Sequence, residues 1–138
     1  MADGVTTLAH AFANGGYRTH AVVNVDFLDP EKFGVTRGFE TVDVQSYDNN
    51  REVRAARATT EAALRWVEEE AGDEPFFLLV HYFDPHCVYA PPGAFRERWA
   101  APEDRESEWT FGTREQMIAI RTGRLTPGAD TIRRAKRL

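Results

Sequence analysis

The hydrophobic positions in the first part of the chain switch between helical and strand spacing. Leu8, Ala11 and Phe12 form an apolar stripe between a capping threonine and a pair of glycines, which predicts a short helix. The valine-rich stretch that follows is typical of a strand, and prolines and glycines then break the pattern into a loop. The expected elements are a helix over 6–16, a strand over 19–25, a loop over 29–38 and a short edge strand over 39–44.

The longest helical pattern runs from about residue 50 to residue 71. Its apolar positions recur at spacings of three and four from Val53 to Val67, while its glutamates and its arginines, Arg54 among them, are expected to face water. Gly72 ends this helix, and the unbroken apolar run Phe76–Val80 follows at once. Such a run is typical of a central parallel strand that is buried on both faces.

This order of elements predicts an α/β fold, part of a doubly wound, mostly parallel sheet flanked by helices. After the strand the pattern weakens: prolines make an irregular loop, residues 95–99 suit one helical turn, and residues 101–112 are polar and poorly periodic. A last helix is expected after Thr126, with Pro127 at its first position. The 138 residues suit one domain, or part of one.

Composition and charge narrow the function classes. The chain is 42% hydrophobic with a formal net charge of -5, as in soluble globular proteins, so no nucleic-acid or membrane partner is expected. From Arg114 onward seven basic residues face two acidic ones, which a solvated amphipathic helix explains better than a nucleic-acid arm. Cys87 is the single cysteine, so the chain forms no internal disulfide. No signal-peptide pattern and no apolar run of membrane length occur, so the chain as it stands would be cytoplasmic, while the sequence leaves the localisation of the protein open.

Candidate chemistry gathers in His81-Tyr-Phe-Asp-Pro-His86, the segment that leaves the Phe76–Val80 strand. Open α/β sheets bind ligands beyond the carboxyl ends of their strands. Because Pro85 restricts the backbone just before it, His86 is the first candidate for contacting an anionic substrate oxygen or a leaving group. A buried polar contact explains His81 better than a functional role does, and a turn or a loop cap explains Asp84 at least as well.

The same segment offers no complete reaction centre. A metal site made of His81, Asp84 and His86 would lack zinc-type spacing, and no second cluster of ligands occurs to complete it. No nucleophile or phosphate-loop motif is present, and Cys87 points away from His86 in an extended segment. The local chemistry therefore predicts a substrate-binding loop, with no catalytic residue and no metal ligand in the chain.

Three successive segments carry motifs in a fixed order. They are Thr7-Leu-Ala-His-Ala-Phe-Ala-Asn-Gly-Gly-Tyr-Arg-Thr19, then Phe33-Gly-Val-Thr-Arg-Gly-Phe-Glu40, then Pro75-Phe-Phe-Leu-Leu-Val-His-Tyr-Phe-Asp-Pro-His86 with Tyr89 and Pro91-Pro92 after it. Together they resemble the sulfatase family of the alkaline-phosphatase superfamily, whose fold is a doubly wound α/β sheet. The resemblance covers residues 5–95, and residues 96–138 form a helical end that it does not reach.

The resemblance implies a function and one contact residue. In sulfatases the histidine of the Pro-His motif contacts the sulfate group, which assigns that role to His86. A lysine and a histidine that often help bind sulfate have no counterpart in Val23-Asn-Val-Asp26, where Asn24 is a further candidate for substrate binding along with His81 and Asp84. The family's nucleophile would lie upstream of Thr7 and its calcium ligands outside this chain. The resulting expectation is a sulfatase fragment that binds a sulfate ester, of a small molecule or a glycan, and is inactive alone.

Two other functions fit the same residues. A phosphodiesterase or phosphonate hydrolase of the same superfamily would use the same loop for a phosphate group. A non-catalytic α/β module would bind an anion or a partner through the His86 loop and the basic tail. The substrate and the oligomeric state are not fixed by the sequence.

Overall fold

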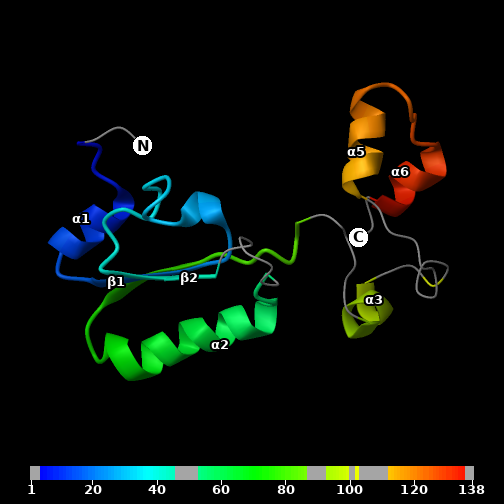
Figure 1. Ribbon diagram of the computed structural model, residues 1–138. Helices are drawn as coiled ribbons and strands as arrows, with labels where there is room; N and C mark the ends of the chain where they lie inside the picture. The colour runs from blue at the N-terminus through cyan, green and yellow to red at the C-terminus, as the bar shows by residue number, and fades with distance from the viewer. Residues whose placement is uncertain (1–3, 46–52, 87–92, 100–101, 103–111, 136–138) are drawn as a thin grey trace. The chain divides into compact units, whose positions relative to one another are not determined.

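The computed structural model describes residues 4–45, 53–86, 93–99, 102 and 112–135. The chain divides into two compact units, residues 1–84 and 85–138. The first unit contains a three-stranded parallel sheet with helices on both faces, so the expected α/β class is confirmed (Figure 1). No helix in the described ranges has the length and apolarity that a membrane span requires.

The sheet has the strand order β2-β1-β3. Its strands are β1 (Arg18–Val23) at the centre, β2 (Thr41–Val44) on one side and β3 (Phe76–Val80) on the other. In register, His20 pairs with Thr41 of β2 and with Leu78 of β3. All three carboxyl ends therefore lie at one edge of the sheet.

Two helical segments cover the two faces of this sheet (Figure 1). Helix α1 (Leu8–Asn14) starts at a capping box in which Thr7 and His10 bond each other's backbone amides. Helix α2 (Ala56–Trp66) continues into a π-helical turn, η2 (Val67–Ala71), and ends at Gly72, whose φ of 65° suits glycine. The remaining element of this unit is a 3-10 turn, η1 (Asp26–Leu28), just after β1.

Side-chain alternation along the strands builds one small core on each face. On the α1 face, the ring of Phe77 stacks on Phe12 at 4.4 Å and on Phe39 at 5.4 Å between centroids. On the α2 face, the ring of Trp66 stacks on His20 at 4.8 Å and meets Phe76 edge-on. The centre of β1 is the most buried part, since Ala21, Val22 and Val23 have no exposed surface.

The position expected for the Phe76–Val80 strand is wrong. The strand lies at an edge, no residue of it is fully buried, and Phe76 is 42% exposed. The central strand is instead β1, whose mixture of polar and apolar residues gave no signal of double-sided burial. An unbroken apolar run shows that both faces of a strand can be buried. How far they are buried depends on how many strands and helices pack around that strand.

The start of the long helix also differs from its expected position. Regular helix begins at Ala56, because residue 55 is extended (ψ 155°) and residues 53–55 lead up to it. Residues 50–52 lie outside the described ranges. Arg54, expected to face water, is 8% exposed because its guanidinium pairs with the end of β2. The strands at 18–23 and 41–44 confirm the expected elements within one or two residues at most ends.

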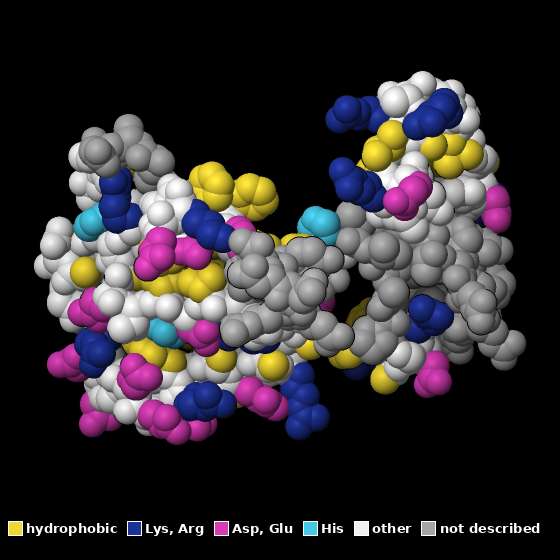
Figure 2. Space-filling model, in the orientation of Figure 1, with side chains coloured by type: hydrophobic (Ala, Val, Ile, Leu, Met, Phe, Trp, Pro, Cys, Tyr) yellow, Lys and Arg dark blue, Asp and Glu magenta, His cyan; other side chains and the backbone are white. Residues whose placement is uncertain are grey.

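The second unit contains the helices α3 (Gly93–Trp99), α5 (Arg114–Arg121) and α6 (Ala129–Ala135). The single turn expected at 95–99 is a seven-residue helix, and α6 begins two residues after Pro127. Helix α5 lies in the basic stretch for which a solvated amphipathic helix was expected without bounds, and Thr113 and Gln116 form a capping box that marks its start. Figure 2 shows arginines gathered over the part of the unit that contains α5, in line with the charge count of the sequence.

Candidate functional site at the carboxyl edge of the sheet

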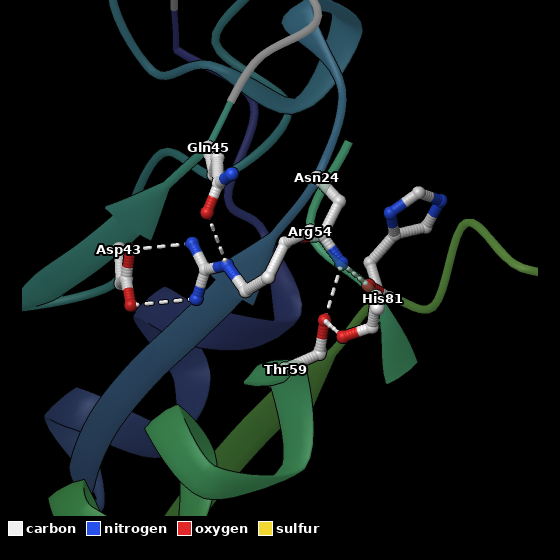
Figure 3. Close-up of polar contacts among 7 residues, drawn as sticks. Asn24, Asp43, Gln45, Arg54, Thr59 and His81 are labelled. Carbon is white, nitrogen blue, oxygen red and sulfur yellow. Dashed lines mark hydrogen bonds and ion pairs between the residues drawn. The ribbon is translucent and has the colours of Figure 1, made fainter. Parts of the chain in front are cut away.

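Polar side chains follow the carboxyl ends of the three strands. Asn24 comes directly after β1, Gln45 directly after β2 and His81 directly after β3. The start of α2 lies at the same edge, because Arg54, two residues before the helix, and Thr59 within it bond to this set (Figure 3). This is the edge at which open α/β sheets bind ligands.

Asn24 is fully buried and ties the two strand ends to α2. Its Nδ2 donates to Thr59 Oγ1 at 2.9 Å and to the backbone carbonyl oxygen of His81 at 2.6 Å. Because both of these partners accept, the amide orientation is fixed and Oδ1 points elsewhere. Within the described part of the chain, Asn24 Oδ1 is buried without a hydrogen-bond partner. A buried amide oxygen in that state favours binding a donor group.

Asn24 and His81 do not form one side-chain cluster. The register Val22 to Val80 places His81 beside Val23 and Asn24 beside Tyr82, and His81 donates its backbone N–H to the carbonyl of Val22 at 2.9 Å. Alternation therefore puts the Asn24 amide on the α2 face and the imidazole on the α1 face. Figure 3 shows the imidazole of His81 turned away from Thr59 and from the Asn24 amide.

The imidazole of His81 lies near an aromatic ring on its own face. Its ring lies 6.4 Å from the ring of Phe83, and its Nδ1 is buried without a hydrogen-bond partner among the residues described. A buried polar contact was one explanation for this histidine. No described residue makes such a contact with Nδ1. The candidate role of His81 in substrate binding stays a prediction.

The Asp84 carboxylate lies at the N-terminus of α2. Its Oδ1 accepts a hydrogen bond from the Ala56 backbone N–H at 2.9 Å. Since Ala55, the N-cap residue, supplies no side-chain cap, Asp84 fills that function from a distant part of the sequence. The negative charge also suits the positive end of the helix dipole. The anion-binding end of α2 is therefore occupied by the chain's own carboxylate.

The segment after β3 is anchored at three successive places. The His81 carbonyl accepts from Asn24, the Tyr82 hydroxyl bonds Thr60 Oγ1 at 2.8 Å, and the Asp84 carboxylate caps α2. His86 follows two residues later as an exposed side chain at the start of the second unit. Asn24, His81 and Asp84 are thus brought to one edge, by contacts that mainly order the backbone.

The strongest ionic contact at this edge was missed from the sequence. Arg54 Nη1 and Nη2 donate to the two carboxylate oxygens of Asp43 at 2.8 and 2.7 Å, and Arg54 Nε donates to Gln45 Oε1 at 3.1 Å. The carboxylate neutralises the guanidinium, so Arg54 stabilises the fold and is not available to bind an anionic ligand. An aspartate at the end of a strand and an arginine eleven residues later give no local pattern that would reveal this pair.

The described residues contain no group of three or more His, Cys, Asp or Glu side chains that could hold a metal ion. The calcium ion implied by the family resemblance thus finds no donor set in these ranges. The loop residues Tyr89, Pro91 and Pro92, and Cys87, lie outside them. No family model, no curated protein and no solved structure matches the chain.

Proposed function

We propose that the chain is a part of a sulfuric ester hydrolase domain and supplies one contact to the sulfate group, through His86. The observation that carries the proposal is the anchored segment after β3. Three side-chain contacts order residues 81–84 in succession, so that the turn at Pro85 and His86 starts from a fixed point. A loop ordered in this way at the carboxyl edge of a parallel sheet suits ligand binding.

The chemistry assigned to His86 is electrostatic. An imidazole N–H donates a hydrogen bond to a sulfate oxygen, and the negative charge of the sulfate group strengthens that bond. The bond-breaking step belongs to a nucleophile and a metal ion that the family resemblance assigns to segments other than this chain. The proposal therefore expects binding from these 138 residues and no turnover.

A titration of the chain with inorganic sulfate, followed by the NMR signals of the His86 ring, tests the binding step. We expect saturable shifts that His86→Ala weakens about tenfold or more, the effect of losing one charge-assisted hydrogen bond. Arg121→Ala is the matched control, because it removes a full positive charge from an exposed position of α5. Equal weakening by both variants would mean unspecific charge attraction and would reject the His86 contact.

Phosphate and an aryl sulfate separate the remaining functions. Tighter binding of phosphate than of sulfate would favour the phosphodiesterase or phosphonate hydrolase alternative. Robust hydrolysis of an aryl sulfate by the chain with calcium would contradict the proposal that it is inactive alone. If no anion binds saturably, a non-catalytic module that binds a partner would be the better-supported function.

A further inference from the structure

The outer edge of β3 presents a regular row of backbone groups. In the parallel ladder with β1, Arg18 N–H donates to the Pro75 carbonyl and His81 N–H to the Val22 carbonyl, both at 2.9 Å. This ladder uses the N–H groups of residues 77, 79 and 81. The N–H and C=O groups of Phe76, Leu78 and Val80 therefore point outward, where no described strand pairs with them.

The two edges of the sheet differ in how well they are protected against pairing with another strand. β2 is short, follows Glu40 and carries Asp43, so charge discourages another strand from pairing there. β3 carries no charged residue between Glu74 and His81, and its five side chains are all apolar. An apolar strand of this kind, whose outer edge pairs with no strand in the described part of the chain, is a template for a further strand.

From these observations we infer that β3 pairs with β3 of a second copy of this chain, in antiparallel orientation about a two-fold axis at Leu78. The outward groups match such a pair in register. Phe76 of one copy lies opposite Val80 of the other, and Leu78 opposite Leu78, which are the hydrogen-bonded positions of an antiparallel ladder. Phe77 then faces Leu79 across the non-bonded position. Every cross-strand pair is apolar, and no two like charges meet.

Helix α2 and the turn η2 carry two apolar side chains on the same side of the unit, the exposed Leu64 and the half-buried Val67. Thr60 lies on that side of α2, because its hydroxyl bonds the Tyr82 hydroxyl just beyond β3. Leu64 and Val67 follow Thr60 at helical spacing, and Leu64 is 52% exposed. A two-fold axis perpendicular to the sheet keeps both α2 helices on one face. With strands about 4.8 Å apart, helices that each lie over β1 and β3 come within about 10 Å, the distance at which helices pack.

Sedimentation of the whole chain at increasing concentration tests the pairing. We expect a reversible change from monomer to twice the monomer mass, weakened about tenfold or more by Leu64→Lys, which places a charge in the interface without touching the sheet. The matched control is Val35→Lys, since Val35 is a similarly exposed aliphatic residue (43%) in the segment that leads into β2, the opposite edge of the sheet. This control should leave the mass distribution unchanged.

Amide hydrogen exchange identifies the interface itself. The amides of Phe76, Leu78 and Val80 should become protected as the concentration rises, whereas those of Phe77 and Leu79 should be protected throughout by β1. A chain that stays monomeric at all concentrations overturns the inference. So does a dimer in which the three outward amides remain unprotected, or one that responds equally to Leu64→Lys and Val35→Lys.

Discussion

Arg54 and Asp43 join the start of α2 to the end of β2 through two parallel hydrogen bonds of 2.7 and 2.8 Å. The arginine side chain is 7% exposed and the aspartate side chain 42% exposed. This difference in exposure, more than the bond lengths, decides how much stability is lost when either partner is replaced. A buried cation that loses its partner cannot turn to water, whereas the aspartate can.

The two single substitutions should therefore differ in cost. Among the residues that the structure describes, Asp43→Ala leaves the guanidinium with the contact to Gln45 alone, and we expect a loss of about 2–3 kcal/mol in the free energy of unfolding. Arg54→Met keeps the buried aliphatic volume and leaves a hydrated carboxylate, so about 1 kcal/mol is expected. Urea unfolding of both variants and of the double variant measures the difference. A larger cost for Arg54→Met would contradict the assignment of Arg54 as the buried partner.

The His20 imidazole makes the fold sensitive to mild acid. Burial lowers the pKa of His20 below its ordinary value of 6.5, although Glu70, Asp43 and the contact with Thr41 oppose that shift. The unfolded chain then takes up a proton at higher pH than the folded chain does. Stability is accordingly complete above about pH 6.5 and falls as the pH drops from there toward the lower folded pKa.

Urea unfolding at about pH 7.5 and about pH 5.5 should show this loss, and His20→Phe should reduce it while keeping a ring stacked on Trp66. The pKa of Glu40 is also lowered, by the Thr19 backbone N–H and by Arg18, but its contribution is lost only below its ordinary value of 4.5. The ordinary pKa values of the two groups, 6.5 and 4.5, therefore separate the effect of His20 on stability from that of Glu40. An unchanged pH dependence in His20→Phe would assign the acid sensitivity to another group.

The capping contact of Asp84 can be separated from any chemical role. Asp84→Asn keeps an oxygen that can accept from the Ala56 N–H, so the stability should change by only a few tenths of a kcal/mol. Asp84→Ala removes the acceptor and should cost about 1 kcal/mol. Thermal unfolding of the two variants gives both values. If sulfate binding is also lost in Asp84→Ala but kept in Asp84→Asn, the carboxylate acts by ordering the segment before His86.

Local patterns in the sequence predicted the elements well and their neighbours poorly. Valines marked β1, and the spacing from Val53 to Val67 marked α2, because each signal lies within one element. The edge position of β3, the pair Arg54–Asp43 and the contact between Asp84 and α2 each join elements distant in the sequence. Of the candidate site residues, the sequence located the segment from His81 to His86 at a strand end. It could not show that Asn24 and His81 belong to opposite faces of the sheet.

The loop before β2 depends on glycine at one of two similar positions. Gly38 has a φ of 97°, and a Cβ added there would lie 2.5 Å from His10 Nδ1, the atom that completes the cap of α1 with Thr7. Gly34 also has a positive φ, 64°, but a Cβ there meets nothing within 4 Å. Gly38→Ala should therefore cost about 2–4 kcal/mol, because the strained backbone and the displaced His10 add, whereas Gly34→Ala should cost about 1 kcal/mol from backbone strain alone. Urea unfolding compares the two, and amide exchange at the start of α1 should quicken only in Gly38→Ala. Equal costs for the two variants would show that the close approach to His10 contributes nothing to stability.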